Sequence, residues 1–167
     1  MLIDLSWLKL HPKETEKFYI KQGPESFKTE DEDLDLIEPV VVELSVTNTG
    51  RLMVGQGKIQ SAVRLNCARC LKDFLYKVDV PFTVEFCSEE NKEYFKGEES
   101  FIYFKEPQVE IGPLVRENIL LSLPMKALCF EDCKGLCPVC GVDLNQKQCE
   151  CSQKDTDPRW NKLKELL

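Results

Sequence analysis

The sequence has a single histidine, His11, among its 167 residues. Histidine is the most frequent general base in enzymes, and the Gly-x-Ser-x-Gly and Gly-x-x-x-x-Gly-Lys-Ser/Thr motifs are missing as well. Paired acids such as Glu89 and Glu90 lie in a polar stretch that is typical of a solvated loop. We therefore expect a protein that is not an enzyme and has no small-molecule substrate.

Long uncharged apolar runs are also missing, and none approaches the roughly 18 residues that span a bilayer. The first residues include Asp4 where a signal peptide would carry basic residues. These absences predict no membrane partner and a cytoplasmic protein, in the bacterial cytosol or in an organelle stroma or matrix. A net charge of −7 argues against a simple nucleic-acid-coating protein.

Cysteine, in contrast, is abundant, and six of the nine cysteines lie in residues 129–151. The string Cys137-Pro-Val-Cys140-Gly141 has the form of a zinc knuckle, because a C-x2-C turn supplies two ligands of a tetrahedral Zn²⁺ ion. In a reducing compartment such a cluster indicates metal binding rather than disulfides. We expect four Zn²⁺ ligands among Cys129, Cys133, Cys137, Cys140, Cys149 and Cys151, and we favour Cys137 and Cys140 with two of Cys133, Cys149 and Cys151.

A second pair, Cys67-x-x-Cys70, joins two strand-like runs. It is either a knuckle that binds its own metal or shares a site with Cys137 and Cys140, or a turn with free thiols. A thioredoxin-like role is less favoured, because no helix N-terminus is there to lower the pKa of Cys67. Cys87 stands alone after an apolar run and is predicted to be a core residue at a strand end.

Alternating and β-branched patterns predict an α+β fold, with a curled antiparallel β-sheet or partly open barrel, a few helices and a C-terminal zinc-knuckle-like segment. We expect a β-rich core domain over residues 1–128, with acidic loops at about 25–38 and 88–100. Residues 129–167 then form the cysteine-rich knuckle and a terminal helix. The predicted strands include residues 18–20, 40–49, 52–59, 61–66, 74–86 and 101–104.

Local signals refine these elements. Gly55 and Gly57 predict a bulge or sharp curvature, and Pro81 predicts an edge or bend. A helix is expected from Pro113 to just before Pro124, with an apolar face turned to the core. Asp157 is placed to cap the terminal helix, whose apolar spacing predicts docking on the sheet or a partner.

Four strings stand out in the sequence, at residues 47–50, 66–71, 121–126 and 132–145. The last contains Gly135-Leu-Cys-Pro-Val-Cys-Gly141 and Leu144-Asn145, and Cys149-x-Cys151 follows it. Together these strings resemble the YceD-type large ribosomal RNA subunit accumulation proteins. Asp143 departs from this pattern, which often has asparagine there. The resemblance implies a factor needed for synthesis, processing or stability of 23S ribosomal RNA.

On this basis we expect a non-catalytic ribosome-biogenesis factor whose partner is a ribosomal RNA precursor or a ribosome-assembly protein. The expected RNA or partner contacts are the basic residues Arg64, Arg69, Lys72 and Lys134. The alternative is a zinc-stapled adaptor that binds only proteins, such as RNA polymerase or a nuclease, and whose acidic loops form the recognition surface.

Overall fold

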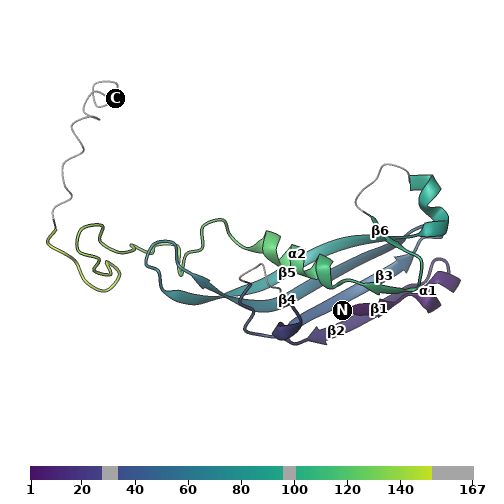
Figure 1. Ribbon diagram of the computed structural model, residues 1–167, viewed down its shortest axis with the longest axis horizontal. Helices are drawn as coiled ribbons and strands as arrows, with labels where there is room; N and C mark the ends of the chain where they lie inside the picture. The colour runs from purple at the N-terminus through teal and green to yellow at the C-terminus, as the bar shows by residue number, and fades with distance from the viewer. Residues whose placement is uncertain (28–33, 96–100, 152–167) are drawn as a thin grey trace, which may run out of the picture.

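A computed structural model describes residues 1–27, 34–95 and 101–151, and its elements form one long sheet with a smaller sheet and two helices beside it (Figure 1). The strands and helices are β1 (Leu2–Asp4), α1 (Ser6–Leu10), β2 (Thr15–Gln22), η1 (Pro24–Phe27), β3 (Val40–Asn48), β4 (Met53–Asn66), β5 (Asp73–Ser88), η2 (Glu89–Phe95), β6 (Phe101–Phe104), β7 (Gln108–Glu110) and α2 (Gly112–Ser122).

The main sheet has the strand order β2-β3-β4-β5-β6 and is not closed. Strands β2 to β5 pair antiparallel, as expected, whereas β6 pairs parallel to the end of β5. A small antiparallel sheet of β1 and β7 completes an α+β fold. The predicted fold class is confirmed, with one parallel strand pair that the sequence patterns did not indicate.

The β4–β5 hairpin is the longest feature, with one-to-one pairing from Met53 opposite Phe86 to Asn66 opposite Asp73. The two runs predicted as 52–59 and 61–66 are therefore one continuous strand. Of the two alternatives expected at the glycines, a bulge or sharp curvature, the bulge is wrong, because the register passes through them without an extra residue. Gly57 instead leaves room for the ring of Phe82, which a Cβ atom would approach to 2.6 Å.

The sheet buries one face and leaves the other in solvent. On β3, Val40, Val42 and Val46 are fully buried, while the intervening Glu43 is exposed, as the alternation of strand side chains requires. The small sheet and both helices contribute to the same core, through Ile3, Leu8, Val109, Val115 and Ile119 among others. The opposite face of the sheet is consequently free of covering elements within the described residues.

Part of the predicted acidic loop belongs to this core. Leu34 and Leu36 are buried, and Leu36 pairs with Val63 as a bridge beside β4. Pro81 lies on β5 before the segment that β6 covers, so the prediction of a local strand edge agrees with the pairing. The expected terminal helix after Asp157 lies outside the described residues. Of the helices in the described part, none has the length and apolar character needed to cross a membrane.

Candidate metal centres

Eight of the nine cysteines gather in two groups of four beyond one end of the β4–β5 hairpin (Figure 1). Within each group the sulfur atoms all lie within 4.8 Å of one another. The first group, called cluster 1, contains Cys67, Cys70, Cys129 and Cys133; the second, called cluster 2, contains Cys137, Cys140, Cys149 and Cys151.

Cluster 1 is built on the turn that joins β4 to β5. The Cys67 N–H donates to the Lys72 carbonyl at 2.9 Å, and the Leu71 N–H donates to the Cys67 carbonyl at 2.9 Å. Leu71 has a φ of +60°, a left-handed conformation that costs a branched side chain about 1–2 kcal/mol. This turn holds both Cys67 and Cys70 towards the loop that carries Cys129.

Cluster 2 repeats the same turn. The Cys137 N–H donates to the Val142 carbonyl at 2.8 Å, and the Gly141 N–H donates to the Cys137 carbonyl at 2.9 Å. Gly141 has a φ of +72° and takes the place that Leu71 has in cluster 1. Both C-x2-C pairs are thus knuckles of one geometry, although only the second has a glycine where the left-handed residue is required.

The sulfur separations in cluster 1 fit a tetrahedral zinc ion. Cys67 Sγ lies 3.7 Å from Cys133 Sγ, and Cys70 Sγ lies 3.6 Å from Cys129 Sγ. Four thiolates at a Zn–S distance of about 2.3 Å would stand about 3.8 Å apart. All nine cysteines are free, and these separations are far longer than the roughly 2.05 Å of a disulfide.

The thiols of cluster 1 differ in their tendency to ionise. Burial opposes ionisation of Cys67, but backbone N–H groups of Cys70 and Cys129 outweigh it and lower the pKa of Cys67 to about 6. Burial and then the neighbouring thiols raise the pKa of Cys129 to about 12. A metal ion bound here would deprotonate the thiols that coordinate it, and its positive charge would balance the thiolates.

Cluster 2 has the same electrostatic division. Hydrogen bonds from the backbone N–H groups of Cys140 and Val139 lower the pKa of Cys137 to about 6. The Cys140 thiol and burial raise the pKa of Cys151 to about 12. Two groups of four thiols, in which ionisation of one thiol disfavours ionisation of its neighbours, fit binding of Zn²⁺. Four sulfur ligands would leave no open position for water, as in structural zinc sites.

The two clusters are joined by direct contacts. Asn145, in the chain between the two cysteine pairs of cluster 2, directs its Nδ2 to Cys133 Sγ of cluster 1 at 3.4 Å, while its Oδ1 accepts the Lys134 N–H at 2.7 Å. Lys72 Nζ and Asp143 Oδ2 form a 2.6 Å ion pair. Their hydrogen bond raises the pKa of Lys72 and lowers the pKa of Asp143.

Gly135 allows the chain between the clusters to pass close to the first knuckle. Its φ is +77°, and a Cβ atom there would lie 2.8 Å from the Arg69 carbonyl oxygen. That same oxygen accepts the Leu136 N–H at 3.1 Å, and Arg69 Nη1 donates to the Cys133 carbonyl at 2.7 Å. A side chain at position 135 would therefore separate the knuckle from the loop that it binds.

The sequence profile of the family described as "Large ribosomal RNA subunit accumulation protein YceD" matches residues 55–167, more than half of the chain. The chain belongs to the YceD family. The matched region contains all eight cysteines of the two clusters. The family resemblance noted in the sequence is thereby confirmed.

Relatives of the chain come from several lineages. It is 28% identical to the uncharacterised Bacillus subtilis protein YlbN, over 81% of this chain and 78% of that protein. It is 28% identical to the uncharacterised Mycobacterium tuberculosis protein Rv2926c, over 75% of this chain and 61% of that protein. An Arabidopsis thaliana protein named "Large ribosomal RNA subunit accumulation protein YCED homolog 1, chloroplastic" is 23% identical, over 77% and 48%.

The chain thus spans about half to four fifths of the length of these relatives. No solved structure matches it significantly.

The structure divides the predicted ligands between two places. Four of the six candidates form cluster 2, and they include Cys137 and Cys140 together with Cys149 and Cys151, one of the sets favoured from the sequence. Cys129 and Cys133 lie instead with Cys67 and Cys70. A shared site of the two knuckles is therefore not what the geometry indicates. Cluster 1 also combines residues from both sides of the domain boundary predicted at residue 128.

Three of the four predicted RNA or partner contacts have partners within the chain. Arg64 lies 3.6 Å from Asp35, while Arg69 and Lys72 make the cluster contacts described above. Lys134 contributes its main-chain N–H to Asn145. Cys87 is fully buried at the end of β5, as predicted, and the His11 ring stacks on Trp7 at 4.4 Å, away from both clusters.

Asn145 is the site residue to which sequence reasoning gave no role. The signal that marked it was its place in the Leu144-Asn145 string downstream of the second knuckle. Its function depends on a carboxamide that reaches a sulfur atom of the other cluster, and this contact becomes evident only once Cys133 is known to belong to cluster 1. Amide donors to metal-bound sulfur are the kind of outer contact that orients ligands and tunes a site.

Proposed function

We propose that this protein is a non-catalytic factor in the accumulation of large-subunit ribosomal RNA, and that it acts by binding precursor RNA or an assembly partner. The observation that carries the proposal is the YceD family match over a region that contains both clusters. The description of the family and the name of the chloroplast relative both state this role. The chain covers 48% of that relative, so the role of the whole relative is extended here by inference.

The metal in each cluster is proposed to be Zn²⁺, held by Cys67, Cys70, Cys129 and Cys133 in one and by Cys137, Cys140, Cys149 and Cys151 in the other. Each ion would cross-link loops that have little apolar core of their own. The placement of Cys67 and Cys70 in a four-sulfur group supports metal binding over thiol exchange by that pair. Nine free cysteines are consistent with a reducing compartment such as cytosol or stroma.

Depletion of the protein in its own cells tests the function. The ratio of large-subunit to small-subunit ribosomal RNA is expected to fall, while unprocessed or degraded large-subunit species increase. Expression of the wild-type chain should restore the ratio, and a chain with Cys67→Ser and Cys137→Ser should not. An unchanged ratio after depletion would contradict the proposed role.

A protein-binding adaptor is the second candidate, and exposed apolar side chains on the cysteine-rich end favour it. Leu71 is 68% exposed, Val139 55% and Phe130 50%, and all three lie on or beside the cluster loops. Exposed apolar groups of this kind are typical of protein contacts. A partner that remains bound after nuclease treatment, and is lost on replacing Leu71 and Val139 with serine, would support the adaptor.

A further inference from the structure

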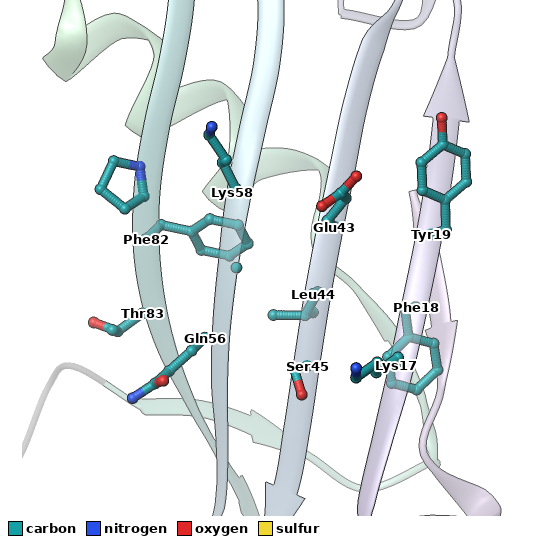
Figure 2. Close-up of a pocket in the computed structure, with 12 residues that line it drawn as sticks. Lys17, Phe18, Tyr19, Glu43, Leu44, Ser45, Gln56, Lys58, Phe82 and Thr83 are labelled. Atoms are coloured by element: carbon teal, nitrogen blue, oxygen red, sulfur yellow. The ribbon is translucent and has the colours of Figure 1, made fainter.

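The uncovered face of the main sheet carries a broad trough of about 870 Å³ across β2, β3, β4 and β5 (Figure 2). Its walls and floor come from four three-residue segments that are aligned by the strand register. In Figure 2 the α2 ribbon lies behind the sheet as seen from this face. The lining residues are Lys17, Phe18, Tyr19, Glu43, Leu44, Ser45, Gln56, Gly57, Lys58, Pro81, Phe82 and Thr83.

Three of the four segments have a middle residue whose side chain packs in or against the core, namely Phe18, Leu44 and Phe82, and in the fourth the middle residue is Gly57. Leu44 and Phe82 are buried, at 2% and 5% exposure, so they present mainly their main chain to the trough. Their neighbours Glu43, Lys58 and Thr83 are exposed on the open face. The result is an open trough bordered by polar and charged side chains.

An exposed aromatic ring stands in this trough. Tyr19 is 68% exposed on β2, and Lys17 and Lys21 flank it at two-residue spacing, which places all three side chains on the same face of the strand. Neither lysine has an acidic partner in the described part of the chain. Such an arrangement offers a stacking surface for a planar group with cations on both sides of it.

The rest of the trough supplies hydrogen-bonding groups. Glu43 lies opposite Tyr19 in the register, and Lys58 lies opposite Glu43 and forms a 2.8 Å ion pair with Asp79. Ser45 and Gln56 face each other in the next row. A carboxylate and an amide on the strands beside an aromatic ring can accept and donate hydrogen bonds at the edges of a stacked base.

We propose that this trough binds single-stranded RNA, with one base stacked on Tyr19, base edges bonded by Glu43 and Gln56, and phosphates bound by Lys17 and by Lys21, which lies beside the trough on β2. Open sheet faces with aromatic rings and nearby cations bind unpaired nucleotides in this way, because every base has a face that can stack. The proposal rests on the proposed function, since it names the surface through which a ribosomal RNA factor would contact its RNA.

The charges of the trough favour RNA over a protein partner. Lysine and glutamate are depleted in protein–protein interfaces, yet Lys17, Lys58 and Glu43 all line the trough. The chain has a net charge of −7, but on the open face of β2 the charged residues are Lys17 and Lys21. Elsewhere, Arg64, Arg69 and Lys72 already bind groups within the chain.

Fluorescence anisotropy of the zinc-loaded full chain with a labelled single-stranded RNA 12-mer of mixed sequence tests the trough. Tyr19→Ala is expected to weaken binding about tenfold, and Tyr19→Phe, which keeps the ring, should bind nearly as the wild type does. Joint Lys17→Glu and Lys21→Glu should weaken binding further and reduce its dependence on salt. A duplex of the same sequence should bind more weakly than the single strand.

Tyr94→Ala is the matched control, because Tyr94 is 66% exposed but lies on η2, outside the trough. Far-ultraviolet circular dichroism checks that each variant keeps its β-structure. Equal RNA affinity of Tyr19→Ala and Tyr94→Ala would overturn the proposal, as would no measurable binding by the wild type. A nuclease-resistant protein partner lost with Tyr19→Ala, without RNA binding, would assign the trough to protein and also overturn it.

The cell assay separates this proposal from the proposed function. Suppose that depletion lowers large-subunit RNA, but that expression of the Tyr19→Ala variant restores it and this variant binds RNA normally. The RNA-binding proposal for the trough is then wrong, and the proposed function is supported. If depletion leaves ribosomal RNA unchanged while the Tyr19→Ala variant loses RNA binding, RNA binding by the trough is supported and the proposed ribosomal role is wrong. Loss of both RNA binding and rescue by Tyr19→Ala, with Tyr94→Ala normal, supports both.

Discussion

Clusters 1 and 2 have the same knuckle but are assembled in different ways. In cluster 1, Cys67 meets Cys133, which is 66 residues away, and Cys70 meets Cys129, which is 59 residues away. Cluster 2 takes all its cysteines from residues 137–151. Three of the four thiols in cluster 1 are buried, whereas Cys140 of cluster 2 is exposed. One cluster therefore closes a long loop onto the end of the sheet, and the other closes a short loop.

This difference predicts which of the two clusters depends on the other for its folding. The free energy of metal binding in such sites is also folding free energy, so each proposed ion would stabilise the segment whose ends it joins. Cluster 1 fixes residues 129–133 on the β4–β5 turn, and Asn145 and Asp143 of the second loop then bind to that assembled unit. We expect cluster 2 to depend on cluster 1 for its position, and cluster 1 to be largely independent of cluster 2.

The largest effect is expected for Cys133→Ser, which removes a buried thiol that is a proposed Zn²⁺ ligand of cluster 1 and the sulfur that Asn145 contacts. Loss of the metal and of this contact should lower the free energy of unfolding by at least about 4 kcal/mol. Zinc content should fall from two ions per chain, and hydrogen exchange should increase throughout residues 129–151. Cys87→Ala, at a buried thiol outside both clusters, is the control and should keep two ions.

Cys140→Ser should have a smaller and more local effect, because it removes the exposed cysteine of cluster 2, a proposed Zn²⁺ ligand. We expect one zinc ion per chain, increased hydrogen exchange in residues 137–151, and normal exchange in β4 and β5. Zinc titration with a chromogenic chelator and exchange mass spectrometry measure both quantities. Loss of both ions in this variant would show that cluster 1 depends on cluster 2 and would reverse the proposed order.

Alanine substitutions at Gly135 and Gly141 compare the two cluster loops by their effect on the backbone. Gly135→Ala places a Cβ 2.8 Å from the Arg69 oxygen at a φ of +77°, whereas Gly141→Ala has nothing within 4 Å and a φ of +72°. Alanine at Gly141 should cost about 1–2 kcal/mol, the usual cost of the left-handed conformation. Gly135→Ala should cost more in the same denaturant titration, and equal costs would mean that the approach to Arg69 contributes nothing.

Much of the fold follows from local patterns in the sequence. The alternation over residues 40–49 predicted β3, and Pro113 and Pro124 marked the ends of α2 to within a few residues. β4 was predicted as two strands separated at Gln60, although its pairing with β5 continues through this residue. The parallel pairing of β6 depends on where the chain returns, and no local pattern records that.

The C-x2-C pairs could likewise be recognised from the local sequence, but they predict only two ligands of each cluster. A C-x2-C spacing predicts two ligands from one turn, and both knuckles have this geometry. Which other two cysteines complete each cluster depends on the length of the β4–β5 hairpin and the path of residues 123–133. Cys129 and Cys133 are close to Cys137 in sequence but lie with Cys67 and Cys70 in space. Sequence distance was therefore a poor guide to the ligand sets.

The smallest effect is expected for Asp143→Asn, which removes the ion pair with Lys72 that connects the two clusters. The amide can still accept the Asn145 N–H that Asp143 Oδ1 accepts, so the loop should keep its shape. Since the Lys72 side chain is 52% exposed, salt screens most of the attraction, and we expect a small loss of stability at low salt that disappears at high salt.

Asp79→Asn breaks the Lys58 pair far from the clusters and is the matched control. A salt-dependent loss of cluster 2 zinc to a chelator in Asp143→Asn, but not in Asp79→Asn, would mean that the first knuckle stabilises the second across this contact. Identical zinc retention in the two variants would leave Asn145 as the contact that transmits the dependence.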